Sequence, residues 1–513
     1  MNQAQNELPV IAHAQEHAKR IAAIDSHSSA TYSALLDRSA SVASALLRTA
    51  NENASATGSR VGGCEDLHGA RIAFLIPPGI SWIATLWGIW RAGGIAVPLA
   101  LSSTRPEIEY YLNDIGASLF VSDATTAATA EPIANDLRIK TLAYESISNT
   151  PAVVLPEVAA EQPAMILFTS GTTNKPKGVV TTHANIVSQI CALVEAWEWA
   201  DSDRIPLFLP LHHVHGIINV VSCALWSGAT VEMMPRFDPQ AVWDRIASGD
   251  LTVFMAVPTI YLRLIAALEA STPERRIELS RAASKLRLMV SGSAALPVPT
   301  LERWREISGH TLLERYGMTE IGMALSNPLH GTRMPGCVGR PLPGVEVRLT
   351  SENGEPLGEG VPGEIEVRGA SVFSEYWGKP DATRESFRSG WFRTGDTAIV
   401  ENGVYRILGR TSIDILKSGG HKISALEIEE VLLDHPSISE CAVVGVPDDE
   451  WGQRVAAAVV LRAGTQLDLD SLRAWGRDKL SAYKLPSRFL VLQALPRNAM
   501  GKAVKPDVVK LFN

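Results

Sequence analysis

One segment anchors the interpretation of this chain: it reads Phe168-Thr169-Ser170-Gly171-Thr172-Thr173-Asn174-Lys175-Pro176-Lys177-Gly178. Apolar residues precede and follow it, which predicts a strand, a hydroxyl-rich turn and then more extended chain. Gly171 and Gly178 allow positive φ, so successive backbone N–H groups can point into one concavity. The hydroxyls and lysines add donors and positive charge. The segment therefore suits a polyphosphate, although it lacks the P-loop pattern, and a solvated surface loop is the alternative.

Two later motifs carry groups that complement a nucleotide. They read Ser291-Gly292-Ser293-Ala294-Ala295 and Arg315-Tyr316-Gly317-Met318-Thr319-Glu320, and a third motif ends in Thr394-Gly395-Asp396. The ring of Tyr316 can stack on a base, and the carboxylate of Glu320 can hold a divalent cation against phosphates. Asp396, on a turn after a strand, can accept hydrogen bonds from two ribose hydroxyls. Taken singly, Tyr316 or Glu320 could equally cap a strand end.

Three histidines lie close together in the turn Leu211-His212-His213-Val214-His215-Gly216. Their spacing invites a zinc interpretation, but no fourth ligand is nearby and no Asp or Glu follows closely. Histidines that hydrogen-bond a bound anion are the favoured interpretation. A partly exposed loop with incidental histidines is the alternative.

Composition limits the classes of partner. The 513 residues are enough for two or more domains, and the net charge of −8 comes with dispersed basic residues, so nucleic acid is not an expected partner. The five cysteines are far apart and favour a reducing compartment. No apolar run reaches the roughly 20 residues that span a bilayer, and the first residues lack a targeting pattern. We expect a cytosolic protein with no membrane partner.

The order of apolar segments predicts an α/β fold. Strands at 72–76, 95–99 and 119–122 alternate with helices at 80–91 and 106–115, which indicates a parallel sheet with crossover helices. The same alternation returns around 253–258 and 286–291. Residues 51–69 are expected to form a surface loop, and residues 335–410 a small β-rich subdomain. A compact α+β unit follows, with a capping box at 424–427 and a helix at 472–480.

Together these motifs resemble those of the acyl-adenylate-forming enzymes, which include acyl-CoA synthetases, peptide-synthetase adenylation domains and luciferases. The resemblance covers about residues 31–502 and is strongest to the malonyl-CoA synthetases. Its marks are the segments 210–216, 313–320 and 410–414. It implies a large N-terminal domain, residues 1–409, built from two doubly wound α/β subdomains and the β-rich subdomain. It also implies a mobile C-terminal domain, residues 410–513, on a hinge at Ser412.

The resemblance implies two half-reactions in one site. A carboxylate and ATP give acyl-AMP and pyrophosphate, and the thiol of coenzyme A then attacks the acyl-AMP. ATP, Mg²⁺ and coenzyme A are the implied cofactors. In the family Ser412 is more often Asp or Lys, and Asn174 is more often Gly, a replacement that Asn tolerates at positive φ.

The implied roles follow residue by residue. The β- and γ-phosphates would contact Thr169, Ser170, Gly171, Thr172, Thr173 and Lys177, and the adenine would contact Ser293, Ala294, Ala295 and Tyr316. Thr319 and Glu320 would serve the α-phosphate and Mg²⁺, and Asp396 the ribose, with Arg410 beside it. Lys502 would bridge carboxylate and phosphate in the first step, His213 is a further catalytic candidate, and Gly419 and Gly420 would flank the pantetheine.

The acid is predicted from Arg315. A buried second carboxylate must be paired, and a guanidinium can hold it bidentately. His215 and Ser293 match the other carboxylate contacts of the subgroup, and Arg236 is a further candidate. The alternative is a structural ion pair of Arg315, with Glu302 or near Glu314.

Malonate is therefore the predicted acid, ahead of methylmalonate, acetate, medium-chain and aryl acids. A nucleotide sensor without activity is a rival class, although Lys502, Glu320 and Asp396 are all present. A peptide-synthetase adenylation domain is another, but no carrier-like segment follows Lys502. The oligomeric state, monomer or homodimer, is open.

Overall fold

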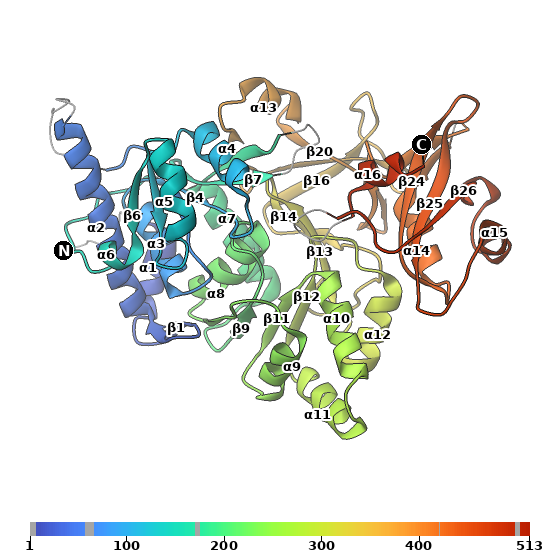
Figure 1. The fold of residues 1–513 in the computed structure, drawn as a ribbon, viewed down its shortest axis with the longest axis horizontal. Coiled ribbons are helices and arrows are strands. Elements are labelled where there is room, and N and C mark those ends of the chain that lie inside the picture. Colours follow the sequence, from blue (N-terminus) through green and yellow to red (C-terminus); the bar gives the residue numbers. More distant parts are fainter. Residues whose placement is uncertain (1–6, 57–65, 170–174, 420, 498–502, 513) are drawn as a thin grey trace.

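The computed structural model describes residues 7–56, 66–169, 175–419, 421–497 and 503–512. Figure 1 shows a large N-terminal body and, at the opposite end from α2, a smaller domain that holds the C-terminus. No helix in the described parts of the chain is long and apolar enough to cross a membrane.

A seven-stranded sheet organises the first part of the chain. Its order is β18 (Glu375–Tyr376), β8 (Lys177–Thr182), β7 (Pro163–Thr169), β4 (Ile95–Pro98), β3 (Arg71–Leu75), β5 (Leu119–Ser122) and β6 (Lys140–Ala143). β3 pairs in parallel with β4 and β5, as the alternating segments predicted. β7 and β8 are antiparallel, so the predicted strand and the extended chain after it are confirmed, while the turn residues 170–174 lie outside the described residues.

Both faces of this sheet are covered, because side chains along a strand alternate between faces. Ile72 and Phe74 of β3 belong to the core that includes α3 (Ile80–Arg91). Ala73 and Leu75 belong to a separate core with α4 (Arg105–Ile115) and α5 (Ala127–Asp136). The sheet is therefore doubly wound.

Two further sheets belong to the N-terminal part, and the second of them carries predicted site residues. One sheet has the order β2 (Ser29–Thr31), β1 (Ile21–Ile24), β10 (Thr230–Met233), β9 (Arg204–Leu207). The next has the order β11 (Val253–Ala256), β12 (Leu288–Ser291), β13 (Leu313–Met318), β14 (Gly322–Ser326), β15 (Arg340–Pro341). A backbone hydrogen bond of 3.0 Å from Thr252 N to Arg204 O joins the two. Parallel pairing of β12 with β13 brings the ends of these strands to one edge.

The remaining helices of the N-terminal part connect or flank these strands. They are α1 (Pro9–Glu16), α2 (Tyr32–Ala56), α6 (Tyr144–Ile147), α7 (His183–Trp197), η1 (His215–Ser222), α8 (Cys223–Trp226), α9 (Pro239–Ala247), α10 (Pro258–Glu269), α11 (Pro273–Ala283) and α12 (Val298–Ser308). α7 begins with a capping box in which Asn185 N donates to Thr182 Oγ1 at 3.1 Å.

The β-rich subdomain is confirmed. Its strands are β16 (Val345–Thr350), β17 (Gly363–Gly369), β19 (Phe387–Arg388), β20 (Trp391–Glu401) and β21 (Val404–Arg410), with α13 (Pro380–Ser386) beside them. In the antiparallel pair of β20 and β21, Asp396 lies opposite Arg410.

The C-terminal domain is an α+β unit. Its sheet contains β22 (Ile415–Ser418), β23 (His421–Ser424), β24 (Ile438–Asp448), β25 (Gly452–Leu461) and β26 (Arg488–Leu492). Its helices are α14 (Ala425–Leu433), α15 (Leu469–Gly476), η2 (Ala482–Lys484) and α16 (Lys505–Lys510). The predicted cap of α14 is present, because Ser424 Oγ accepts from Glu427 N at 3.2 Å.

Three local predictions were wrong. Residues 51–56 continue α2 rather than beginning a loop, because Glu and Ala favour the helix after its apolar period has ended. His215 and Gly216, the last residues of the predicted histidine turn, are instead the first residues of a π-helix, η1. α15 begins and ends several residues earlier than expected, because Asp468 Oδ1 accepts from Ser471 N at 2.8 Å and fixes its start.

Candidate active site

Three elements bring the predicted ribose and adenine residues together. Tyr316, on β13, donates from its hydroxyl to Asp396 Oδ2 of β20 at 2.6 Å. Arg410 Nε, on β21, lies 3.3 Å from Asp396 Oδ1, and Arg410 Nη1 donates to Thr394 O at 2.7 Å. Strand pairing thus holds an aromatic ring, a carboxylate and a guanidinium in one place, as the motifs predicted.

Glu320 lies beside the phosphate segment. It is buried in the turn between β13 and β14, and Tyr376 of β18 donates to its Oε1 at 3.0 Å. Lys177 Nζ, at the start of β8, lies 4.9 Å from the centre of the Tyr376 ring. Burial raises the pKa of the Glu320 carboxyl. A nearby cation would favour the ionised carboxylate, so the position fits a divalent metal ion.

The phosphate segment is described only at its ends. Thr169 and Lys177 face each other across the β7–β8 pair. Ser170, Gly171, Thr172 and Thr173 lie outside the described residues, as do Lys502 and Gly420. Thr319 is half-buried next to Glu320. The assigned roles of these residues stay predictions.

A second group of predicted site residues forms a buried polar cluster. His215 Nδ1 lies 3.2 Å from Ser293 Oγ, and Arg315 Nη2 donates to the same oxygen at 3.3 Å. Ser293 has φ +69°, a left-handed conformation that is uncommon for a residue other than glycine. Gly292 allows the close approach, because a Cβ there would lie 2.5 Å from Arg315 Cζ. Arg315, His215 and Ser293, the residues predicted to contact the acid, thus lie together, and their role in binding it stays a prediction.

Burial lowers the pKa of both basic side chains in this cluster. It lowers the pKa of Arg315 to about 9, and it lowers that of His215, with Arg315 and His213 contributing further. No carboxylate forms a salt bridge with Arg315 among the residues that the structure describes. Glu302 is exposed on α12. The alternative of a structural ion pair is therefore wrong for the described chain.

Several buried polar atoms around Arg315 have no hydrogen-bond partner within the described structure. They are Arg315 Nε, His215 Nε2, Ser291 Oγ, and Nδ2 and Oδ1 of Asn219. Leaving one such group unsatisfied costs about 1–3 kcal/mol. Ser291 precedes Gly292, and Asn219 lies four residues after His215 on η1, hence on nearly the same side of the helix. A polar ligand could satisfy these groups together.

Sequence reasoning missed Asn219, Ser291 and Tyr376. The signal for Asn219 was its place in the apolar segment 217–221, one helical turn after a predicted site histidine. Such an amide is usually buried with partners, and here it has none among the described residues.

Other predicted residues lie nearer the surface. Ala294, Ala295, Arg236, Ser412 and Gly419 are exposed. Arg236 takes no part in the hydrogen bonds or salt bridges between described residues, so its assignment to the acid stays a prediction. The half-buried ring of His213 lies 4.1 Å from that of His212, centre to centre. No three His, Cys, Asp or Glu side chains of the described segments form a metal-binding group.

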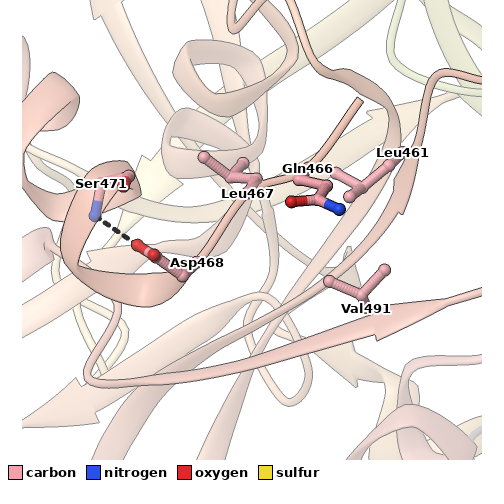
Figure 2. Close-up of a pocket in the computed structure, with 6 residues that line it drawn as sticks. All are labelled: Leu461, Gln466, Leu467, Asp468, Ser471 and Val491. Atoms are coloured by element: carbon pink, nitrogen blue, oxygen red, sulfur yellow. Dashed lines mark hydrogen bonds between the residues drawn. The ribbon is translucent and has the colours of Figure 1, made fainter. Parts of the chain in front are cut away.

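A hollow of about 430 Å³ lies in the C-terminal domain, where the end of β25, the start of α15 and β26 meet (Figure 2). Asp468, its acidic side chain, already accepts from Ser471 N as the cap of α15. The residues that line it are Leu461, Gln466, Leu467, Asp468, Ser471 and Val491. None of them belongs to the predicted site.

The chain belongs to the family of AMP-binding enzymes. The model of the AMP-binding enzyme family matches residues 10–377, and that of the AMP-binding enzyme C-terminal domain matches residues 427–502. This confirms the resemblance to acyl-adenylate-forming enzymes and the arrangement of a large N-terminal and a small C-terminal domain.

Individual relatives are similar over nearly the whole chain. The mitochondrial malonate–CoA ligase ACSF3 of Xenopus laevis is 45% identical over 98% of this chain and 92% of its own length. Malonate–CoA ligase of Arabidopsis thaliana is 40% identical over 96% of this chain and 86% of its own length. The crystal structure of ATP-bound MatB from Rhodopseudomonas palustris has a TM-score of 0.86 at 31% identity, covering 98% of both chains.

Proposed function

We propose that this chain is an AMP-forming malonate–CoA ligase, with a domain boundary at residues 409 and 410. In the first half-reaction a malonate oxygen attacks the α-phosphorus of ATP, and the bond from that phosphorus to the bridging oxygen breaks to release pyrophosphate. In the second, the sulfur of coenzyme A attacks the acyl carbon, the thiol proton is lost, and AMP leaves.

One observation carries the choice of acid: Arg315 is buried, charged and without a carboxylate partner among the described residues. Its Nε, together with His215 Nε2 and the Asn219 amide, offers hydrogen bonds that nothing in the described chain takes. A carboxylate satisfies these groups, and a hydrocarbon tail leaves them buried and unsatisfied. The names of the relatives support the same acid.

The nucleotide part of the proposal rests on the cluster of Tyr316, Asp396 and Arg410. Tyr316 offers its ring to the adenine, and Asp396, held by Arg410, accepts from the ribose hydroxyls. Glu320 would hold Mg²⁺, which supplies positive charge to the phosphates when bound. Lys502 and the hydroxyls of 169–173 would add charge and donors where negative reactants approach each other. His213 stays a further catalytic candidate.

The proposed partners are small molecules, namely malonate, ATP and coenzyme A. The animal relatives are named as mitochondrial proteins, so the cytosolic location expected from the sequence stays a prediction.

The test is an acid panel assayed twice, by pyrophosphate release and by CoA-dependent AMP release. We expect malonate to exceed butyrate in kcat/KM by at least about 100-fold, because a site built for a polar group rejects an analogue that lacks it. Methylmalonate, acetate and an aryl acid complete the panel. Equal activity on butyrate would exclude the dicarboxylate site, and no pyrophosphate with any acid would favour a nucleotide-binding protein without activity.

A further inference from the structure

A buried group of charges lies in the C-terminal domain, outside the site described above. Lys505 Nζ, at the start of α16, lies 2.5 Å from Asp414 Oδ1 and 2.7 Å from Glu429 Oε1. The three side chains are only 11%, 15% and 14% exposed, respectively. Glu429 Oε1 also accepts from Val443 N at 2.7 Å. The lysine thus joins the segment before β22 to α14.

Asp414 also contacts the other side of the predicted hinge. Its Oδ2 accepts from Arg410 N at 2.9 Å, and its own N donates to Arg410 O at 2.7 Å. Ser412 lies between these two residues and is exposed. One carboxylate therefore closes the turn that contains Ser412 and, through its other oxygen, binds Lys505.

Lys505 in turn fixes the chain just after Lys502. α16 packs through Val508 into a core with Val444 and Val446 of β24. On the other side of residues 498–502, Arg497 forms a salt bridge of 2.7 Å with Glu440 and an isolated β-bridge with Ala503. The described residues on both sides of Lys502 are thus held to the domain.

We propose that Lys505 and Asp414 are positioning residues that couple the hinge turn to the segment carrying Lys502. The proposal rests on the proposed function, in which Lys502 serves only the first half-reaction. Movement about Ser412 must alter the contact between Arg410 and Asp414, and Lys505 transmits that change to the start of α16.

Charge explains why the coupling needs Lys505. Without its ammonium group, the carboxylates of Asp414 and Glu429 would be buried near each other with like charge. Asp414 would then move away from Glu429, and the hinge turn would no longer be joined to the start of α16, which follows Lys502 in the chain. A displacement of about 1 Å can cost a reaction roughly 100-fold.

The test compares half-reactions in Lys505→Met and Asp414→Asn. Acid-dependent ATP–pyrophosphate exchange reports the first, and thioester formation from synthetic acyl-AMP and coenzyme A reports the second. We expect exchange to fall at least about tenfold and thioester formation by less than about threefold. Lys505→Arg should restore most of the exchange, and Glu429→Gln, which keeps the Lys505–Asp414 pair, should reduce it less than Asp414→Asn does.

Lys510→Met is the matched control, because Lys510 pairs with Asp507 at 2.7 Å on the exposed side of the same helix. Equal losses in both half-reactions would show a merely structural role and overturn the proposal, as would unchanged exchange. If Lys505→Met does not fold, the comparison of Asp414→Asn with Glu429→Gln decides. The acid is whichever one the wild-type protein activates, so failure of malonate alone contradicts the proposed function and not the coupling. Absence of exchange with every acid contradicts both.

Discussion

The molecule buries two cations in opposite ways. Arg315, in the N-terminal pocket, has no carboxylate partner among the described residues, and burial lowers its pKa to about 9. Lys505, in the C-terminal domain, contacts two carboxylates. Burial alone would lower its pKa, but Glu429 and Asp414 raise it overall. The paired cation is satisfied within the structure, whereas the unpaired one fits the proposed binding of a carboxylate.

The largest expected effect tests the unpaired cation. Arg315→Met should lower kcat/KM for malonate by at least about 100-fold, because a desolvated carboxylate loses its charged partner. Arg315→Lys should restore little, because an ammonium cannot reproduce the guanidinium fork. Steady-state kinetics with malonate and butyrate measures both, and thermal unfolding should show no loss of stability. Loss of stability with activity retained would show that Arg315, like Lys505, stabilises the fold and does not bind the acid.

The second effect tests the paired cation. Lys505→Met should destabilise the protein by about 3 kcal/mol, because it leaves two buried carboxylates without their partner. Denaturant unfolding, followed by a signal from the C-terminal domain, is the measurement, with Lys510→Met as the control. An unchanged unfolding midpoint for Lys505→Met would contradict the assignment of a structural ion group.

A smaller effect separates two buried amides. Asn219→Leu should lower malonate kcat/KM about tenfold without loss of stability, because its amide has no partner in the described chain. Asn327→Leu should do the reverse, since Asn327 Nδ2 donates to Glu314 O at 3.1 Å and Cys337 O at 2.6 Å. The measurements are malonate kcat/KM and the melting temperature of each of the two variants. Similar behaviour of both would remove Asn219 from the acid pocket.

A last effect concerns the pH dependence of stability and a buried acid next to Arg315 in the sequence. Burial raises the pKa of Glu314 to about 8, and its Oε1 accepts from Gly336 N at 3.1 Å. The unfolded chain ionises near pH 4.5 while the folded one stays protonated, so this group lowers stability as pH rises from about 4.5 to 8. The two pKa values correspond to about 3 kcal/mol between pH 5 and pH 8, so Glu314→Gln should gain roughly that much over the wild type across this range. A gain that is constant with pH would contradict this.

The sequence predicted most of the fold, and it predicted the site residues that lie in recognisable motifs. The regular alternation around β3 gave the doubly wound sheet, because period and turn residues are local properties. Tyr316, Asp396 and Arg315 could be proposed as site residues because each lies in a short motif with several other polar or charged groups. Tyr316 contacts Asp396 and Arg315 contacts Ser293, while the roles assigned to these residues stay predictions.

The rest depends on residues that only the fold brings together. Lys505, Asp414 and Glu429 are common residue types at distant positions, and no local pattern marks their meeting. Asn219 was missed because an amide in an apolar helix carries no sign of whether a partner will be near. The helix that holds it is also of the π type, which no apolar period predicted.

Gly292 has a consequence for how the acid preference of such a protein could change over generations. A methyl group at that position would collide with the guanidinium of Arg315. A side chain at 292 would therefore force the guanidinium to shift while the arginine is present, and would meet no such contact once the arginine is lost. If the arginine were lost first, a larger residue at 292 would then occupy its space and hinder its return.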